Sequence, residues 1–320
     1  MKAIRIQAFG PPEVMKMETI ADLEPGPGQV LVKVGAAGVN PVDAYIRAGM
    51  YRPDLPLPYT LGIDGAGTVQ ATGPGVKKVR AGQRVYLTWA ASGSYAEAVL
   101  CAEAHVFPLP DRISFAEGSA LGVPYGTAWR ALFQRARATA GETAFIHGAS
   151  GGVGLAAVQI ARAAGLRVIG SAGTKEGLEL VRMNGAQLAV NHHDTGHWDA
   201  VMKHTGGAGV NVILEMLANV NLGRNLTLLA KGGRIVVIGS RGTVEIDPRE
   251  AMSRDAAVLG MSLFNISPEE LASAHAAIGA GLEQETLRPV VSREWPLSEA
   301  AAAHHAVMEG HSLGKIVLLP

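Results

Sequence analysis

Short runs of alternating apolar and polar residues occupy the first part of the chain, up to about residue 120. Strand candidates lie at residues 30–34, 67–71 and 83–87, and segments such as Pro25-Gly-Pro-Gly28 and Gly73-Pro-Gly75 separate them. A period of two is typical of a half-buried β-strand, and Gly and Pro mark the turns between strands. This part of the chain is therefore predicted to form a compact, mostly antiparallel β domain.

From about residue 122 the pattern changes to apolar strands that alternate with helical segments. Predicted strands lie at residues 143–147, 167–170, 187–190, 210–214, 234–238 and 257–263. Helical segments between them lie at residues 152–164, 175–183, 198–204 and 221–230. Repeated strand–helix units with short connections predict an α/β domain with a doubly wound parallel sheet, the Rossmann arrangement.

The last part of the chain is predicted to return to the first domain. Its pattern predicts a helix at 268–281, a strand near 288–291, a helix at 298–309 and a final strand at 315–319. We therefore expect a β-rich domain of residues 1–121 and 265–320 and a Rossmann dinucleotide-binding domain of residues 122–264.

A glycine-rich turn follows the first strand of the α/β segment, in Thr143-Ala-Phe-Ile-His-Gly-Ala-Ser-Gly-Gly-Val-Gly154. Gly151 lets the backbone approach a pyrophosphate, and Gly154 lets the next helix pack on the strand. The helix N-terminus offers free N–H groups to the anion. Ala149 stands where the usual G-x-G-x-x-G pattern has its first glycine, so the motif alone is imperfect. Its place within a run of six strands nevertheless predicts a dinucleotide site.

The end of the second strand indicates which dinucleotide binds. A site for NAD usually places Asp or Glu there, to bind the ribose 2′-hydroxyl. Here the segment Val168-Ile-Gly-Ser-Ala-Gly-Thr-Lys175 has no acid and offers hydroxyl groups and one cation, which suit a 2′-phosphate. Glu176 lies beside Lys175, and a lysine at a helix start can simply be solvated. On balance the segment favours NADPH.

Composition and charge argue against several other classes. The 320 residues are 48% apolar and 18% charged, and their net charge of zero gives no electrostatic reason to expect nucleic acid or an anionic membrane as partner. The single cysteine, Cys101, cannot form an intramolecular disulfide and suits a reducing compartment. No apolar span is long enough for a membrane helix, so we expect a cytoplasmic protein.

Six motifs carry a resemblance that covers essentially the whole chain. They are Gly38-Val-Asn-Pro-Val-Asp-Ala-Tyr-Ile-Arg47, Pro58-Tyr-Thr-Leu-Gly-Ile-Asp-Gly-Ala-Gly67, Tyr95-Ala-Glu97, His147-Gly-Ala-Ser-Gly-Gly-Val-Gly154, Glu215-Met-Leu-Ala-Asn-Val-Asn221 and Ile238-Gly-Ser-Arg-Gly242. In these motifs the chain resembles the zinc-independent quinone oxidoreductases of the medium-chain dehydrogenase/reductase superfamily, in particular the zeta-crystallin-like group.

The resemblance implies a GroES-like β-rich catalytic domain beside the Rossmann domain, NADPH as cofactor, and a homodimer or homotetramer. Residues that match positions beside the nicotinamide are the candidate catalytic residues Asn40, Asp43, Tyr45 and Tyr51. Candidate cofactor-binding residues, again by matching position, are Tyr45, Thr127, Ser150, Gly151, Gly152, Val153, Gly173, Lys175, His192, Asn221, Ile238, Gly239, Ser240, Arg241, Met261, Ser262 and Leu263. The chain departs from the family pattern at Gln83, where the family has an aspartate, and at Met50 and Leu61.

No metal is expected. Zinc-dependent members of the superfamily hold the catalytic metal with a cysteine, a His-Glu pair and a second cysteine. Here Ala37 stands near the first cysteine position, Ile63-Asp64 replaces the His-Glu pair, and one cysteine cannot build the site.

Two groups of histidines could suggest a different metal. They are His192, His193 and His197, and His304, His305 and His311. No cysteine or carboxylate obviously completes either group, so we expect solvated histidines. His192 is the exception, because a residue just past the third strand faces the adenosine. A hydrolase is not expected, because no Gly-x-Ser-x-Gly motif surrounds Ser150.

The expected activity is the reduction of quinones, or of related conjugated carbonyl compounds, by NADPH. A quinone is already electrophilic, so hydride transfer needs mainly alignment and a dry site. The proton can come from water or from a hydroxyl such as that of Tyr45. Asp43 is either a general acid/base or a residue that caps its helix or pairs with Arg47.

Two alternatives to quinone reduction stay open. The first is reduction of an activated C=C bond in enals, enones or enoyl thioesters. The second, from a different class, is a zeta-crystallin-like structural or RNA-binding role, against which the zero net charge argues.

Overall fold

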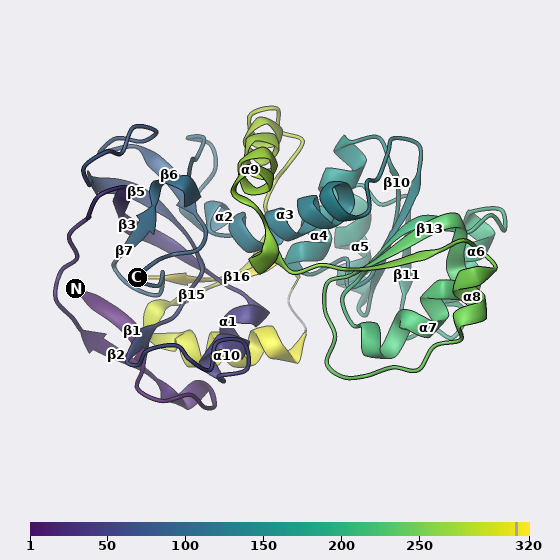
Figure 1. Cartoon of the computed structure of the whole chain (residues 1–320), viewed down its shortest axis with the longest axis horizontal. Coiled ribbons are helices and arrows are strands. Elements are labelled where there is room, and N and C mark those ends of the chain that lie inside the picture. The colour runs from purple at the N-terminus through teal and green to yellow at the C-terminus, as the bar shows by residue number, and fades with distance from the viewer. Residues whose placement is uncertain (311–312) are drawn as a thin grey trace. The chain divides into compact units, whose positions relative to one another are not determined.

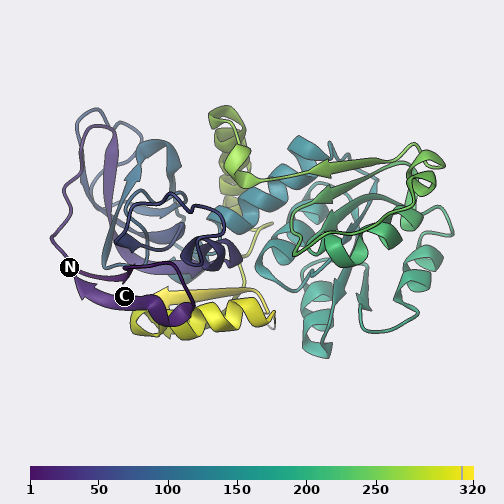
Figure 2. The ribbon, with the colours of Figure 1, turned by 60° about the horizontal axis from the view of Figure 1, so that its bottom comes forward.

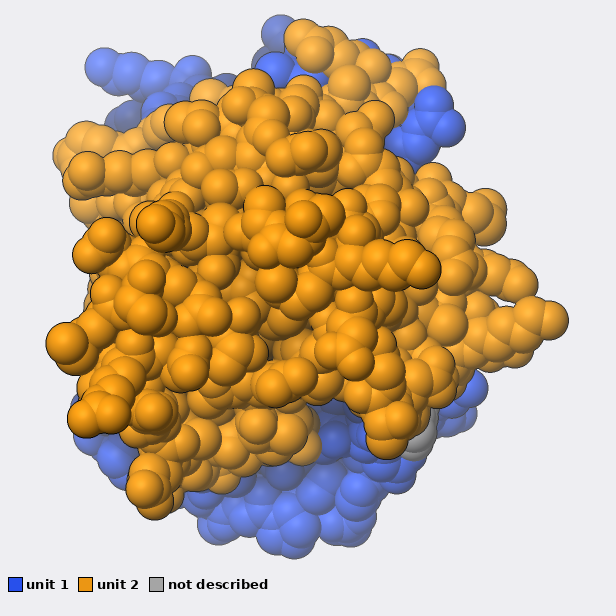
Figure 3. Space-filling model, turned by 90° about the vertical axis from the view of Figure 1, so that its right-hand side faces the viewer, with its two compact units in different colours: residues 1–123, 279–283, 288–320 blue, residues 124–278, 284–287 orange. Residues whose placement is uncertain are grey.

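The computed structural model describes residues 1–310 and 313–320, so His311 lies outside the described residues. These residues form two compact units (Figure 3): unit 1 comprises residues 1–123, 279–283 and 288–320, and unit 2 comprises residues 124–278 and 284–287. Helix α9 (Pro268–Glu283) lies in unit 2 as far as Ile278, although we expected residues from 265 onward in the β-rich domain. The helix start is tied to unit 2 because Gln134 donates to the carbonyl oxygen of Glu270 at 2.8 Å.

Unit 1 is built on a seven-stranded sheet (Figure 1). Its strands run in the order β15-β16-β3-β5-β6-β8, and β7 also pairs with β3. All pairs are antiparallel except β15 with β16, as the alternating sequence pattern predicts for a β-rich domain. The bounds are β3 Gln29–Val39, β5 Asp64–Thr72, β6 Arg84–Leu87, β7 Ala98–Ala102, β8 Val106–Pro108, β15 Val291–Pro296 and β16 Lys315–Leu319.

A smaller sheet and three helices complete unit 1. The three-stranded sheet has the order β2-β1-β4, with β1 Lys2–Ile6, β2 Met15–Thr19 and β4 Tyr59–Thr60. The helices are α1 Pro41–Arg47, α2 Phe115–Gly118 and α10 Ala300–Glu309, with 3-10 turns η1 Pro12–Val14, η2 Glu103–His105 and η5 Leu297–Glu299. Figures 1 and 2 show α10 alongside β15 and β16, where its apolar face joins a core that includes Ile6, Tyr95 and Leu318.

The C-terminal strand β16 lies between β15 and β3 in the larger sheet. Ile316 of β16 lies opposite Val39 of β3. On the other side of β3, Asp64 of β5 lies opposite Gly38. This register brings the end of β3, the start of β5 and the start of β16 together, although they are far apart in the sequence.

Unit 2 is a doubly wound parallel sheet. Its strands run in the order β11-β10-β9-β12-β13-β14, and every pair is parallel. Counted from β9 as the first strand, this is the 3-2-1-4-5-6 order of the Rossmann fold, so the predicted fold class is confirmed. The bounds are β9 Thr143–Ile146, β10 Arg167–Ala172, β11 Leu188–Asn191, β12 Val210–Glu215, β13 Leu229–Val237 and β14 Ala257–Gly260.

Helices connect the strands of unit 2, and α3 and the turn η3 precede the first of these strands. Because such crossovers are right-handed and the strand order reverses at β9, the helices cover both faces of the sheet. Their bounds are α3 Gly122–Trp129, the π-helical turn η3 Arg130–Arg135, α4 Gly152–Ala163, α5 Lys175–Met183, α6 His197–His204, α7 Ala218–Leu228, α8 Pro248–Met252 and the 3-10 turn η4 Leu263–Asn265. Within the described ranges of the chain, no helix is long and apolar enough to cross a membrane.

The core of unit 2 is formed by apolar side chains of the central strands and of α7. Phe145 of β9, Ile213 of β12 and Leu226 of α7 are all completely buried in one cluster. The predicted helix at 175–183 is confirmed in full. The predicted helix at 221–230 begins earlier and ends at Leu228, because the next residues enter β13 and pair beside β12.

Shortening one side chain of α7 tests this packing. Leu226→Ala should lower the free energy of unfolding by about 2–5 kcal/mol, because it leaves a cavity in a fully buried cluster. Met252→Ala in α8 is the control, since 74% of Met252 is exposed, and it should change stability by less than about 0.5 kcal/mol. Urea unfolding of both variants makes the comparison, and equal losses would contradict the assignment of this core.

Candidate functional site

The glycine turn between β9 and α4 shows which of its glycines the fold itself requires. A Cβ atom on Gly154 would lie 2.3 Å from the carbonyl oxygen of Gly148, so strand and helix approach too closely for any side chain. A Cβ atom on Gly151 would come no closer than 3.5 Å to the same oxygen, an ordinary contact. The fold therefore needs glycine at 154 but not at 151, where the missing side chain leaves room for a ligand.

The start of α4 offers that room a set of hydrogen-bond donors. Gly151 is the N-cap, and the first intrahelical bond runs from the N–H of Leu155 to its carbonyl oxygen at 2.9 Å. The N–H groups of the first helical turn have no partner within the helix, and they carry the positive end of its dipole. The helix starts at the carboxyl end of β9, where the strand order reverses between β9 and β12. These residues fit a dinucleotide pyrophosphate.

The other candidate cofactor residues of unit 2 follow the carboxyl ends of neighbouring strands. Gly173 and Lys175 follow β10, His192 follows β11, Asn221 lies in α7 after β12, Ile238, Gly239, Ser240 and Arg241 follow β13, and Met261, Ser262 and Leu263 follow β14. Thr127 is buried in α3. Because the carboxyl ends of parallel strands meet at one edge of a sheet, the strand-end residues share the edge that carries the glycine turn.

The end of β10 is followed by an exposed cation, Lys175. The hydroxyl of Thr174 caps α5 by accepting from the N–H of Gly177 at 3.0 Å, and Ser171 is completely buried. Lys175, the first residue of α5, is exposed. No acidic residue lies at this strand end before Glu176. Lys175 is thus the charged group best placed to bind a 2′-phosphate.

A buried polar cluster stands at the switch point between β9 and β12. Glu215, the last residue of β12, is completely buried and accepts from the N–H of Leu217 at 2.5 Å and from the Asn221 amide at 3.2 Å. It also accepts from the side chain of Asn225, whose Oδ1 lies 2.8 Å from Nε2 of His147. Burial lowers the pKa of His147. The cluster fixes the turn after β12 and with it the candidate cofactor residue Asn221.

Unit 1 holds a second buried polar cluster around Asn40, which directly follows β3. The side-chain amide of Asn40 donates to Oδ2 of Asp64 at 3.0 Å, and its Oδ1 accepts from the ammonium group of Lys315. The Lys315 Nζ lies 3.6 Å from the same Asp64 Oδ2. All three side chains are buried. The register of β3 with β5 and β16 creates this contact.

Asp64 is surrounded by donors. Thr88 donates its hydroxyl to Oδ1 at 3.0 Å, and the N–H of Val123 lies 2.9 and 3.0 Å from the two oxygens. Burial raises the pKa of Asp64, while the charge of Lys315 opposes that rise. Burial likewise lowers the pKa of Lys315, and Asp64 opposes that fall. Each residue of the pair therefore stabilises the charged form of the other.

Asp43 faces this cluster from α1. Its Oδ2 accepts from the backbone N–H of Asn40 at 2.9 Å, which caps the helix. Of the two structural roles considered for Asp43, capping is therefore present, while Arg47 contacts the Gly10 carbonyl and His304 instead. The other carboxyl oxygen, Oδ1, is buried without a hydrogen-bond partner among the described residues. Burial raises the pKa of the Asp43 carboxyl to about 7.

A chain of hydrogen bonds ends at Asp43. Arg47 Nη1 lies 3.2 Å from Nδ1 of His304, whose Nε2 lies 3.1 Å from the hydroxyl oxygen of Tyr95. The guanidinium can only donate, so Nδ1 accepts and the proton of the neutral ring is on Nε2. Burial lowers the pKa of His304 to about 3, so the ring is neutral at pH 7. The Tyr95 hydroxyl then donates toward Asp43 Oδ2, 3.5 Å away.

The two candidate tyrosines lie side by side in unit 1. The ring of Tyr45 in α1 stacks on the ring of Tyr51, with centroids 5.6 Å apart and planes at 17°. Tyr51 is 54% exposed. The stacked pair forms an aromatic surface on which a flat ring can pack.

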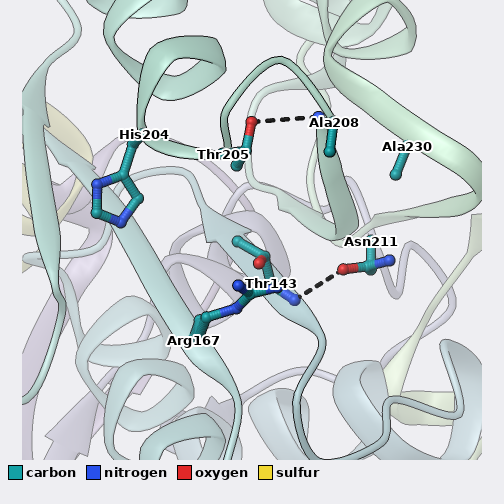
Figure 4. A pocket seen from close by; sticks show the side chains of 8 residues that line it. Thr143, Arg167, His204, Thr205, Ala208, Asn211 and Ala230 are labelled. Carbon is teal, nitrogen blue, oxygen red and sulfur yellow. Dashed lines mark hydrogen bonds between the residues drawn. The ribbon is translucent and has the colours of Figure 1, made fainter.

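A pocket of about 240 Å³ lies at the opposite, amino-terminal edge of the unit 2 sheet (Figure 4). The N–H of Thr143, at the start of β9, donates to Asn211 Oδ1 at 2.9 Å in its wall. The lining residues are Thr143, Arg167, His204, Thr205, Ala208, Gly209, Asn211 and Ala230. None of the candidate cofactor residues lines this pocket, so it is separate from the candidate dinucleotide site.

Comparisons with known proteins agree with this arrangement. Two family models match, the alcohol dehydrogenase GroES-like domain over residues 26–111 and the zinc-binding dehydrogenase over residues 152–279. The human protein named quinone oxidoreductase is 46% identical over 321 residues, covering 100% of this chain and 98% of its own. The chain belongs to the zinc-independent quinone oxidoreductases of the medium-chain dehydrogenase/reductase superfamily.

Solved structures of this superfamily superpose over the whole chain. The structure of Escherichia coli quinone oxidoreductase complexed with NADPH has a TM-score of 0.90 and 28% identity, with 100% of both chains covered. A structure described as an NAD-dependent alcohol dehydrogenase has a TM-score of 0.93 and 30% identity, also with 100% of both chains covered. The predicted family and fold are therefore confirmed.

One matching family model is named for zinc-binding enzymes, but this chain lacks the two cysteines and the His-Glu pair that hold zinc in such enzymes. Its one cysteine, Cys101, is buried in β7, and burial raises the pKa of its thiol to about 12. Over residues 1–310 and 313–320, no group of three or more His, Cys, Asp or Glu side chains is placed to hold a metal ion.

The expectation that the histidine groups are solvated is wrong for two members. His304 is completely buried, because the face of α10 that carries it packs on α1 and β16. His197 is also buried and stacks against Trp198. His305, by contrast, is exposed and lies 2.7 Å from the Glu13 carboxylate.

Several residues of the two polar clusters are absent from the predicted site. In unit 2 they are His147, Glu215 and Asn225, and in unit 1 they are Asp64, Thr88, Tyr95, His304 and Lys315. A signal existed for Asp64 and Glu215, each a carboxylate next to an apolar strand segment. No local signal distinguishes the buried Lys315 from an exposed strand lysine such as Lys33.

The pKa of Asp43 predicts a pH dependence of stability. Its folded pKa of about 7 lies above 3.8, the ordinary pKa of an aspartate, so the folded state holds the proton more tightly. The contribution of this group to stability should therefore fall as the pH rises from about 4 to about 7 and stay constant above. Relative to Asp43→Asn, the wild type should lose up to about 4 kcal/mol of unfolding free energy across this window.

Urea unfolding of both proteins between pH 4 and pH 8 measures this difference. The matched control is Asp54→Asn, which replaces an exposed carboxylate of the same unit and should leave the pH dependence nearly unchanged. A wild-type minus Asp43→Asn difference that stays flat over the whole range would contradict a buried, proton-holding Asp43.

Proposed function

We propose that this chain is an NADPH-dependent quinone reductase that transfers hydride without zinc. The observation that carries the proposal is the full-length likeness to proteins named quinone oxidoreductase, at 46% identity to the human one. The Rossmann sheet with its glycine turn supplies a dinucleotide site. Related conjugated carbonyl compounds belong to the same proposed substrate class.

The residues of unit 2 support NADPH over NADH. Gly151 and the N-terminus of α4 would hold the pyrophosphate, and Lys175 would pair with the 2′-phosphate. β10 ends at Ala172 and not at an Asp or Glu that could bind a ribose 2′-hydroxyl. Relatives differ here, since one solved structure with a similar fold is described as NAD-dependent and another is complexed with NADPH.

When bound, NADPH supplies the hydride. Asn40, Asp43, Tyr45 and Tyr51 would position the acceptor and exclude water from it, and the stacked tyrosines would contact a flat ring. A quinone needs no metal to polarise it, because the negative charge that develops delocalises into an aromatic hydroquinone. A proton for the product would come from water, from the Tyr45 hydroxyl or from the protonated Asp43 carboxyl.

We also propose that the protein is a cytoplasmic homodimer or homotetramer. Within the described chain β14 pairs only with β13, so one edge of the unit 2 sheet is open. Val258 on this strand is 42% exposed, and an open edge with apolar side chains favours pairing with another copy. The single buried cysteine suits a reducing compartment.

The cofactor preference is tested at Lys175. Lys175→Ala should weaken NADPH binding about ten- to a hundredfold and NADH binding only slightly, because the lost contact is a charge-assisted bond to the 2′-phosphate. The control Lys203→Ala removes another exposed lysine of unit 2, from α6, and should change neither constant. Fluorescence titrations of both cofactors give the values. Equal losses for NADPH and NADH would show that Lys175 does not bind the phosphate.

The substrate class is tested with the purified protein in the presence of a chelator. We expect NADPH oxidation with ortho- or para-quinones and none above background when simple alcohols are offered with NADP⁺, since no Lewis acid is present to stabilise an alkoxide. Enones are tested with NADPH in a third set of reactions. Turnover of enones far above that of quinones would move the assignment to C=C reduction, and robust alcohol oxidation by metal-free protein would refute it.

A further inference from the structure

Lys315 is an unusual lysine in this protein. It opens the apolar strand β16, yet only 3% of it is exposed. A buried ammonium group costs several kcal/mol unless it is paired, and replacing a buried ion pair with apolar residues is often neutral or stabilising. Burial of this cation is therefore poorly explained by stability alone and calls for a second role.

We propose that Lys315 is a positioning residue for the substrate site: held by Asp64, its ammonium group fixes the side chain of Asn40 and, through Asn40, the carboxyl group of Asp43. This proposal rests on the proposed function, which assigns Asn40 and Asp43 to the substrate site. Lys315 itself is not a candidate to touch the substrate.

The chemistry of the two partners fixes the orientation of the Asn40 amide. A side-chain amide has an accepting and a donating end of nearly equal size, so its orientation follows from its partners. Lys315 can only donate, so it donates to the oxygen of Asn40. The carboxylate of Asp64 can only accept, and it accepts from the Asn40 amide N–H at 3.0 Å. Removing Lys315 leaves the oxygen end without this donor, and the amide can then rotate.

The same arrangement reaches Asp43 through the backbone. Asn40 is the N-cap of α1, and its N–H donates to Asp43 Oδ2 at 2.9 Å. The position of Asn40 thus sets where the capping carboxyl group lies. Asp43 Oδ1 is the atom of this set that makes no hydrogen bond among the described residues, and it is buried.

The charge of Lys315 also acts on the Asp43 carboxyl from a distance. The groups that face Asp43 are Asp64 from β5, Lys315 from β16, Tyr59 from β4, Tyr95 from the segment before β7, and His304 and Arg47 behind Tyr95. Burial is the main cause of its raised pKa, Asp64 raises the pKa further, and Lys315 lowers it. Loss of the Lys315 charge should therefore make Asp43 hold its proton to higher pH.

The test compares Lys315→Met and Lys315→Gln with Val317→Ala in the full chain. Lys315→Met removes the charge and the donor, and Lys315→Gln removes the charge but keeps a donor for Asn40. Val317→Ala is the matched control, because it weakens the packing of the same buried strand without touching Asn40. Thermal unfolding shows how far each variant is destabilised.

The first readout is steady-state reduction of a para-quinone by NADPH. Lys315→Met should lower kcat about tenfold or more and leave the KM for NADPH within about twofold, because most proposed NADPH contacts lie in unit 2. Lys315→Gln should lose less kcat, and Val317→Ala should keep kcat within about twofold. A kcat of Lys315→Met that matches the Val317→Ala value would overturn the proposal.

The second readout needs no cofactor or substrate. Asp43→Asn is introduced into the wild type, Lys315→Met and Lys315→Gln. For each of these three proteins, the change in unfolding free energy caused by Asp43→Asn is measured against pH. In both Lys315 variants its midpoint should move up by about half a pH unit or more. An unmoved midpoint in either folded variant would overturn the coupling of Lys315 to Asp43.

The two readouts separate this proposal from the proposed function. If the wild type does not reduce quinones with NADPH, the proposed function fails, while the shift of the Asp43 midpoint still decides whether Lys315 controls this cluster. If the wild type is active and both Lys315 variants behave like Val317→Ala, the positioning role alone fails.

Discussion

Charged side chains can be buried only where partners meet them, and unit 1 satisfies this constraint through strand register. β3 pairs with β5 on one side and with β16 on the other, which sets Gly38 opposite Asp64 and Val39 opposite Ile316. The carboxylate of Asp64, the ammonium of Lys315 and the amide of Asn40 are brought together by these pairings. A slip of either strand by one residue would turn its side chains to the other face and leave a charge buried alone.

The same constraint operates at the switch point of unit 2. The strand order reverses between β9 and β12, and in such folds a dinucleotide binds in the crevice beyond the carboxyl ends of these strands. Glu215 is buried at this point, with its oxygens bonded to the turn that follows and to two asparagine side chains. These bonds fix the turn after β12. The glycine turn after β9 is fixed in a different way, by the close approach of α4 to β9 at Gly154.

The chemistry proposed for this family member depends on the acceptor as much as on the protein. In zinc-dependent relatives a metal polarises the carbonyl, whereas here Ile63 and Asp64 occupy the position of the His-Glu pair. Asp64 accepts a hydrogen bond from Asn40 and pairs with Lys315. In this chain the position is part of a hydrogen-bonded frame, which suits an acceptor that is electrophilic without a metal.

The sequence by itself determined the fold class, the glycine turn and the family. These features depend on local periodicity, on backbone requirements at single glycines and on motifs of contiguous residues, all of which are readable along the chain. Helix α5 and strand β16 match their predicted bounds for this reason. The segment after β10 likewise showed a missing acid and a lysine without any knowledge of contacts.

Only the tertiary structure decided which polar residues are buried and what they contact. Lys315 and Asn40 are separated by most of the chain, and His304 belongs to a histidine group that was expected to be solvated. Their burial follows from strand register and from the face that α10 turns to the sheet, which are properties of the packed molecule. Periodicity can indicate that a strand is apolar, but it cannot indicate which distant charge will lie beside it, because that depends on how all the strands pair.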